Sequence, residues 1–158
     1  PAAGGNTIFR NMYQALEIMP AALRARIEGV TMKHDPLFTG AGEPRQGVEI
    51  DGVFDVSTSP GISHPVIRNH PDTGRQALYL GRRQNAYING LSVAESEALL
   101  DELWDHALAN TDVWTQEWRL CDTLIWDNRC CIHNRDAFDN NARRIMHRTQ
   151  IRSEERPY

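Results

Sequence analysis

The sequence predicts a mainly β fold with helices, in which short strands form a sandwich or barrel. Runs of alternating or β-branched residues recur between turn-forming residues and dominate the C-terminal half. Only one segment, residues 92–108, has strong helical periodicity. The chain has 158 residues, which is enough for one domain with a hydrophobic core.

The N-terminal third contains short elements and a long loop. Residues 7–13 are expected to form a strand that runs into a helix. Pro20 fits the start of a second short helix, AALRARIE, which Gly29 ends. Residues 38–65 are rich in Gly, Pro, Ser and Asp, which predicts a loop or lid-like insertion with a brief strand at residues 53–56.

The middle of the chain holds the strongest predicted element. Residues 75–80 and 84–88 are expected to be strands around a Gly-Arg-Arg turn. Ser92 and Glu95 then form a capping-box pattern at the start of a helix, and His106 is expected at the surface or the boundary of this helix. The apolar positions of this helix recur at helical spacing: Leu99, Leu100, Leu103, Trp104, Ala107 and Leu108. Further strands are expected at residues 113–119, 123–126 and 143–151.

Composition excludes several classes of function. The formal net charge is −4, so we expect neither a nucleic-acid partner nor an anionic membrane surface. No apolar run reaches the roughly 20 residues that span a bilayer. The three cysteines, Cys121, Cys130 and Cys131, suit a reducing cytoplasm better than a disulfide framework. The N-terminus lacks a signal-peptide pattern and an initiator methionine, so we expect a piece of a longer polypeptide.

Two arginines share one face of the last predicted strand, residues 143–151. On such a strand Arg144 and Arg148 lie about 13 Å apart, at roughly 3.3 Å per residue. Arginine binds carboxylates through a planar, two-pronged contact. The periodicity leaves two interpretations open. Either the pair faces a site and holds two anionic groups, or it faces solvent while Ile145 and Ile151 face the core.

One histidine lies where metal ligands are often found. His133 follows a strand-like run and begins a polar turn. His70-Pro71-Asp72, with His133 as a distant partner, fits the string of an iron-binding facial triad. We exclude that triad, because Pro71 disfavours a central strand and PDTG is strong turn chemistry.

Several segments together carry a resemblance to one family. They are GGNT (4–7), NMYQALEIMP (11–20), HPVIRNHPDTGRQALYL (64–80), GLSVAESEALLDELWDH (90–106) and, above all, WDNRCCIH (126–133) with RRIMHRTQI (143–151). In this order they resemble the C-terminal portion of the taurine / 2,4-dichlorophenoxyacetate dioxygenase family, whose members depend on iron(II) and 2-oxoglutarate. The resemblance implies a double-stranded β-helix, the cupin-like jelly roll, incomplete at the N-terminus. Residues 1–158 are then the C-terminal portion of one dioxygenase domain.

The resemblance also implies a role for four residues. His133 matches the distal histidine ligand of the iron. Arg144 and Thr7 match the residues that hold the far carboxylate of 2-oxoglutarate. Arg148 matches the arginine that holds the anionic group of the primary substrate, which favours the interpretation in which both arginines face a site.

The sequence departs from the family at two places. The His-x-Asp ligands of the family lie before the segment that matches residues 4–7, so the resemblance implies that they are not in this sequence. The family also usually has glycine where this chain has Cys121, at a turn before Asp122.

The implied function is that of an Fe(II)- and 2-oxoglutarate-dependent dioxygenase. Such an oxidoreductase uses O2 to decarboxylate 2-oxoglutarate to succinate and CO2 and hydroxylates a small organic anion, here a sulfonate, phenoxyalkanoate or alkyl sulfate. A homo-oligomer, dimer or tetramer, is expected by the same resemblance. One alternative is a non-catalytic fragment or pseudoenzyme that retains the barrel and binds no iron. Another is a barrel-type metal hydrolase that uses His70, Asp72 and His133.

Overall fold

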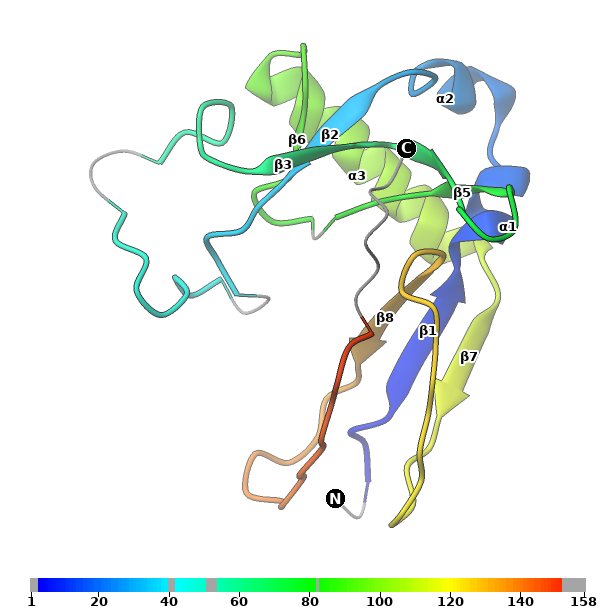
Figure 1. Cartoon of the computed structure of the whole chain (residues 1–158), viewed down its shortest axis with the longest axis vertical. Coiled ribbons are helices and arrows are strands. Elements are labelled where there is room, and N and C mark those ends of the chain that lie inside the picture. Colours follow the sequence, from blue (N-terminus) through cyan, green and yellow to red (C-terminus); the bar gives the residue numbers. More distant parts are fainter. Residues whose placement is uncertain (1–2, 40–41, 51–53, 82, 152–158) are drawn as a thin grey trace.

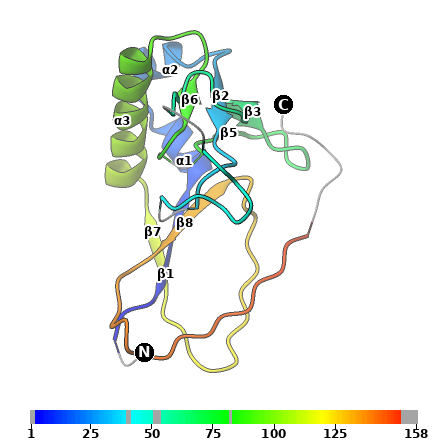
Figure 2. The ribbon, with the colours of Figure 1, turned by 90° about the vertical axis from the view of Figure 1, so that its left-hand side faces the viewer.

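The computed structural model describes residues 3–39, 42–50, 54–81 and 83–151. Within these ranges the chain forms eight strands and three helices. The strands make three small, open sheets (Figure 1). Two sheets and the helices form an upper body, and the third sheet extends away from it (Figures 1 and 2). The prediction of a mainly β architecture with a few helices is confirmed at this level.

The extended sheet has three antiparallel strands. Strand β1 (Thr7–Asn11) lies in the middle and pairs with β7 (Val113–Gln116) on one edge and with β8 (Cys131–Arg135) on the other. In this register Phe9 lies directly opposite His133. Strand β1 runs directly into a helix at Met12, as predicted for residues 7–13. Its pairing with β8 positions His133.

The upper body contains the two other sheets. Strand β2 (Thr31–His34) lies between β3 (Ile62–Pro65) and β6 (Tyr87–Ile88). Strand β4 (Ile67–Asn69) pairs with β5 (Gln76–Leu78). The two strands predicted around the Gly-Arg-Arg turn thus exist as β5 and β6, but each pairs with a different partner rather than with the other.

All three expected helices form. They are α1 (Met12–Glu17), α2 (Ala21–Ala25) and α3 (Val93–Asn110). Ser92 caps α3 and exchanges hydrogen bonds with Glu95, so the predicted capping box is confirmed. None of the helices in the described part of the chain has the length and apolar composition of a bilayer-spanning segment.

The hydrophobic core lies where α1 and α3 pack on the strands of the upper body. Its largest fully buried apolar side chains are Met12, Leu16, Ile27, Met32, Leu78, Ile88, Leu100 and Leu103. Leu108 was expected in the core but is 44 % exposed, because it projects from α3 beside the buried face rather than on it. His106 was expected at the surface or the boundary but is buried, at 9 % exposure, with its Nε2 2.7 Å from the carbonyl oxygen of Ala15.

The predicted long loop is tied to β2 by one buried side chain. Between Asp35 and Gly61 the described residues form no helix or strand, and β3 takes the last four residues of the expected loop. Lys33 is buried, and its ammonium group donates to three loop carbonyls, those of Val56, Ser57 and Ser59, at 2.6, 3.1 and 2.7 Å. The brief strand expected at 53–56 is wrong for residues 54–56, and Val53 lies outside the described residues.

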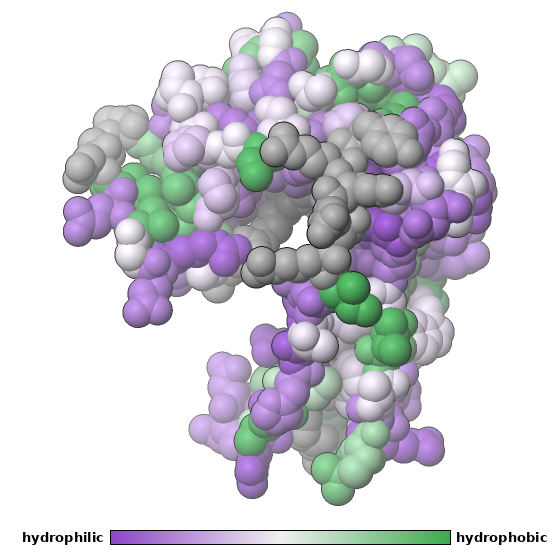
Figure 3. Space-filling model, in the orientation of Figure 1, coloured by the Kyte–Doolittle hydropathy of each residue, from purple (hydrophilic) through white to green (hydrophobic). Residues whose placement is uncertain are grey.

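Two predicted strands do not form. Residues 123–126 and 143–151 run as extended segments away from the sheet (Figure 2). Extended backbone becomes a strand only when a neighbouring backbone supplies hydrogen bonds. Among the described residues no neighbour does so. As a result, several apolar side chains of these segments are exposed, including Ile125 and Ile151. Hydrophobic surface is visible on the lower extension of the molecule (Figure 3).

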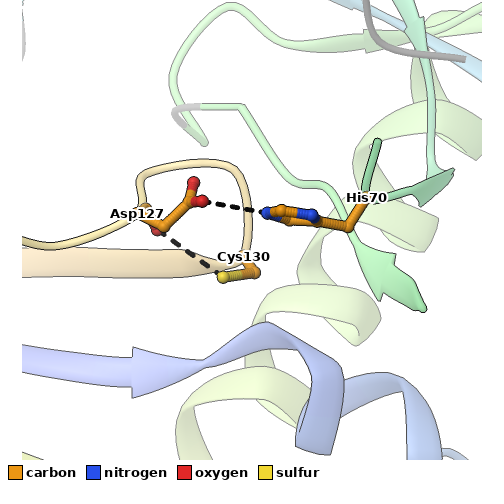
Figure 4. A group of neighbouring side chains, drawn as sticks. All are labelled: His70, Asp127 and Cys130. Atoms are coloured by element: carbon orange, nitrogen blue, oxygen red, sulfur yellow. Dashed lines mark hydrogen bonds and ion pairs between the residues drawn. The ribbon is translucent and has the colours of Figure 1, made fainter. Parts of the chain in front are cut away.

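A charged network joins the turn before β8 to the turn between β4 and β5. His70 Nε2 lies 2.9 Å from Asp127 Oδ2, and Cys130 Sγ donates to the backbone oxygen of Asp127 at 3.7 Å (Figure 4). The Arg129 guanidinium donates to both carboxylate oxygens of Asp127 and, at 2.6 Å, to Asp72. Hydrogen bonds from Arg129, followed by the one from His70, hold the pKa of the Asp127 carboxyl well below its ordinary value.

Truncation of a core side chain on α3 tests the packing. Leu100→Ala is expected to lower the free energy of unfolding by about 2–5 kcal/mol, because Leu100 is fully buried and its removal leaves a cavity. Leu108→Ala on the same helix is the matched control and should change it by about 0.5 kcal/mol or less. Urea denaturation followed by circular dichroism measures both. Equal losses in the two variants would contradict the described core.

Removal of the Asp127 charge tests the network. Asp127→Asn is expected to lower the free energy of unfolding by about 1–3 kcal/mol near neutral pH, because charge-assisted hydrogen bonds are lost. The folded pKa of Asp127 is lowered below the unfolded value of about 3.9, so its contribution is present above that pH and is lost as the pH falls. The difference between wild type and variant should therefore shrink on acidification.

The control for this experiment is Glu117→Gln. The Glu117 side chain is exposed and makes no hydrogen bond with the described part of the chain. Its replacement should leave the pH dependence of unfolding unchanged. A gap between wild type and Asp127→Asn that stays constant down to acid pH would argue against a stabilising charge at Asp127.

Candidate active site

An open cleft of about 2070 Å³ lies between the extended sheet and the two extended segments that leave it. The cleft is lined by residues 3–7, 117–129 and 143–151, together with Arg68 and His133. All four residues expected in the site line this cleft: Thr7, His133, Arg144 and Arg148.

His133 is held on β8 between two aromatic rings. Its imidazole stacks on Phe9 with ring centres 5.7 Å apart and meets Trp126 edge-on at 5.1 Å. Burial lowers the pKa of His133, and the nearby positive charge of Arg148 lowers it further. The imidazole is therefore neutral near pH 7, and a neutral ring nitrogen has a lone pair that can bind a metal ion.

Thr7 begins β1 at the edge of the cleft. Its side chain is buried, and its Oγ1 accepts a hydrogen bond from Trp118 Nε1 at 2.9 Å. Because a hydroxyl both accepts and donates, the O–H proton of Thr7 is still available for an acceptor in the cleft.

Two glycines explain how the chain reaches Thr7. Gly4 and Gly5 both have left-handed backbones, with φ of 70° and 74°. A Cβ atom on Gly4 would lie 2.1 Å from the carbonyl oxygen of Ala137, so no larger residue fits there. This close approach lets Gly4 bridge to Phe138 and brings the segment after β8 next to Thr7.

Arg144 and Arg148 reach the cleft without forming a strand. Arg144 is half-buried, and its Nε donates to the carbonyl oxygen of Gly5 at 2.9 Å. Its two Nη groups have no hydrogen-bond partner among the described residues. Arg148 is exposed, and its charge acts on His133. The sequence predicted that both arginines lie on one face of a strand. Residues 143–151 pair with no described strand, so that strand does not form in the described part of the chain.

The metal hydrolase hypothesis is wrong for the described residues. His70 bonds to Asp127 and Asp72 bonds to Arg129, and neither converges on His133. In the described part of the chain, the one group of three close ligand atoms is His70, Asp127 and Cys130, all within 4.8 Å of one another. Because the Arg129 guanidinium already neutralises Asp127, this group is a hydrogen-bonded clamp that holds the start of β8.

Several residues at the cleft were not identified from the sequence. Trp118 and Trp126 contact Thr7 and His133, and Arg68 lines the cleft from β4. Val66, Arg68 and His70 are alternately buried along the chain, a period of two that marks the inward face of β4. The sequence itself does not show this face, because β4 has only three residues and the burial of Arg68 is seen only in the structure.

Cys121 has a backbone conformation that is usual for glycine. Its φ is 71°, in the left-handed region that side chains with a Cβ rarely adopt. The cysteine is accommodated because its side chain is exposed.

Comparison with known proteins identifies relatives of this chain. The family model for taurine catabolism dioxygenase TauD, TfdA family, matches residues 1–150. An (S)-phenoxypropionate/alpha-ketoglutarate-dioxygenase of Sphingobium herbicidovorans is 33 % identical over 154 residues, which is 96 % of this chain and 53 % of the relative. An alpha-ketoglutarate-dependent 2,4-dichlorophenoxyacetate dioxygenase of Cupriavidus pinatubonensis is 32 % identical over 94 % of this chain and 50 % of the relative. The chain thus spans about half the length of these relatives.

Two solved structures are similar to this chain in fold. AAD-2 in complex with Mn(II) and N-oxalylglycine superposes with a TM-score of 0.71 at 27 % identity, covering 88 % of this chain and 54 % of that one. A putative alpha-ketoglutarate-dependent taurine dioxygenase from Burkholderia xenovorans gives a TM-score of 0.63 at 27 % identity, covering 87 % and 42 %. The chain therefore belongs to the taurine catabolism dioxygenase TauD, TfdA family.

Proposed function

We propose that this chain is the C-terminal portion of an Fe(II)- and 2-oxoglutarate-dependent dioxygenase that hydroxylates a small organic anion. The observation that carries the proposal is the convergence of Thr7, His133, Arg144 and Arg148, from three separate segments, on one cleft. A phenoxyalkanoate, sulfonate or alkyl sulfate fits two arginines whose charges are not neutralised by acidic side chains among the described residues.

The chain offers one residue that suits iron. His133 presents a neutral, half-buried imidazole, and Trp126 and Phe9 fix its ring orientation. No other potential ligand in the described residues completes a group of three with His133. In our proposal the His-x-Asp ligands belong to a longer polypeptide. Bound iron would supply the activation of O2, while the chain's own residues orient the reactants.

Arg144 and Thr7 are proposed to hold the distal carboxylate of 2-oxoglutarate. The bond from Arg144 Nε to the Gly5 carbonyl fixes the guanidinium and leaves both Nη groups for a two-pronged contact with a carboxylate. The Thr7 hydroxyl, held by Trp118, supplies a further donor nearby. Pre-oriented donors of this kind reduce the entropy lost when the co-substrate binds.

Arg148 is proposed to bind the anionic group of the primary substrate. Its influence on the pKa of His133 indicates that its charge lies close to that imidazole. A substrate anion paired with Arg148 would place the adjacent C–H bonds near the position where His133 would hold the iron. Positioning of this kind selects which bond is hydroxylated.

The architecture is proposed to be one part of a double-stranded β-helix. Residues 143–151 are already extended but lack a neighbouring strand in the described part of the chain. In the complete jelly roll this segment would pair and become a strand. The loop that precedes β3, expected from residue 38 onward, is proposed to form a lid over the substrate.

A non-catalytic role is the second candidate. Its support is that His133 lacks companion ligands among the described residues. The full-length polypeptide, supplied with Fe(II), O2 and 2-oxoglutarate, separates the two candidates. Succinate formation that increases with a sulfonate, phenoxyalkanoate or alkyl sulfate supports the enzyme. Absence of succinate with every member of the panel would leave the non-catalytic role.

Arg144 should determine the affinity for 2-oxoglutarate. Arg144→Gln is expected to weaken 2-oxoglutarate binding about 10- to 100-fold, because one charge-assisted, two-pronged contact is lost. Isothermal titration calorimetry of the metal-loaded full-length protein measures it. The neighbouring exposed residue gives the control, Arg143→Gln, which should keep wild-type affinity. Unchanged affinity in Arg144→Gln would remove the basis for this role.

Arg148 should affect binding of the primary substrate and leave binding of 2-oxoglutarate unchanged. Arg148→Gln is expected to raise the KM for the best anionic substrate at least about tenfold, with 2-oxoglutarate affinity unchanged, since only the substrate anion loses its partner. Steady-state succinate formation gives the KM, and calorimetry gives the 2-oxoglutarate affinity. If both affinities fell together in this variant, Arg148 would not be specific for the primary substrate.

A further inference from the structure

A second basic cluster lies where four strands of the upper body meet. Arg68 on β4 places its guanidinium carbon 4.5 Å from the ring centre of Tyr79. The Tyr79 ring also stacks on His34 at 5.2 Å and contacts His64 at 5.6 Å. The two imidazoles lie 4.8 Å apart. None of these contacts uses the residues assigned above to iron, 2-oxoglutarate or the substrate anion.

The positive charge of Arg68 has no anionic partner within the described part of the chain. Its side chain is 4 % exposed, and it makes no ion pair or hydrogen bond with any described residue. Its Nε and the Nε2 of His34 are both buried without a partner. Arginine stays protonated, and an unpaired buried charge or donor is strongly destabilising. Both side chains contact Tyr79, and each has a buried donor or acceptor atom that lacks a partner among the described residues, which indicates a missing partner beside this ring.

The other lysines and arginines show that a buried, unpaired charge such as that of Arg68 is unusual in this chain. Lys33 is the other buried lysine or arginine among the described residues, and three carbonyl oxygens satisfy it. Arg75 stacks on Tyr13 at 4.0 Å, much as Arg68 stacks on Tyr79. However, Arg75 is 53 % exposed and pairs with Glu17. Arg68 alone combines burial with an unmet charge within the described residues.

The surroundings of Arg68 favour an anion. Burial first, and then the charges of His64 and Arg68, lower the pKa of His34 to about 4, so its imidazole is neutral near pH 7. Burial and Arg68 also lower the pKa of His64. A neutral imidazole can donate one N–H to an oxoanion, and Arg68 can donate several in a planar fork. No described acidic side chain bonds to any of the three residues.

We propose that Arg68 and His34 form a second anion-binding site, which takes the carboxylate or sulfonate of a small organic acid that enters from the cleft. Access is possible because Arg68 lines the cleft. The site is distinct from the one proposed at Arg148, whose charge acts on His133, whereas the charge of Arg68 acts on His34 and His64. Binding here requires neither iron nor 2-oxoglutarate.

Nuclear magnetic resonance of the imidazole groups tests the proposal. Phenoxyacetate and, separately, methanesulfonate are titrated at millimolar concentrations into the iron-free protein. A saturable shift of the His34 and His64 signals is expected. In Arg68→Met the dissociation constant should rise about tenfold or more, since a charge-assisted contact is lost. Wild-type signals that do not move, or that move equally in Arg68→Met, would overturn the proposal.

Three further variants make the result specific. Arg75→Met removes the matched but exposed and paired arginine and should bind as wild type. His34→Phe keeps the ring on Tyr79 and removes one donor, so it should weaken binding with His64 as the reporter even if Arg68→Met fails to fold. Arg148→Gln is expected to lose the anion at the site proposed at Arg148, but it should leave the titration of the His34 and His64 signals unchanged. Loss of the His64 shift in Arg148→Gln with its retention in His34→Phe would assign the anion to the other arginine and overturn the proposal.

Discussion

The pairing of β1 with strands on both of its edges is the constraint on which the cleft depends. A strand hydrogen-bonded on two sides cannot slip by one residue without breaking both ladders and turning every side chain to the opposite face. Phe9 and His133 therefore stay on a common side of the sheet. Gly4 continues the contact beyond the end of β1, because only glycine permits the approach to Ala137. That approach brings Arg144 to the carbonyl of Gly5.

Elements determined by local interactions were predictable, and elements determined by distant partners were not. The capping box at Ser92 and the apolar spacing of α3 lie within one segment, so the sequence contained all that this helix needs. Residues 143–151 have the alternation of a strand, but alternation does not reveal whether a neighbouring backbone is present. Strands β2 and β4 have only four and three residues, too few for a recognisable period.

Some residues of the candidate site could be predicted from the sequence, and others could not. Thr7, His133, Arg144 and Arg148 were found through the spacing of motifs far apart in the chain, and the structure brings all four to one cleft. Periodicity alone left the direction of the two arginines undecided. Arg68 was missed because a sequence does not state which charge is buried and unpaired, a property that emerges only when β4 pairs with β5 and Arg68 stacks on Tyr79. The clamp between His70 and Asp127 likewise joins residues separated by 57 positions.

The adjacent residues Lys33 and His34 link two distant regions through one short strand. On β2, Lys33 reaches toward the loop carbonyls, and the next side chain turns to the opposite face and meets Tyr79. A rotation of this strand about its own axis therefore moves both contacts at once. Strands β3 and β6 pair with β2 on its two edges, so one short sheet supports both the loop contact of Lys33 and the ring contact of His34.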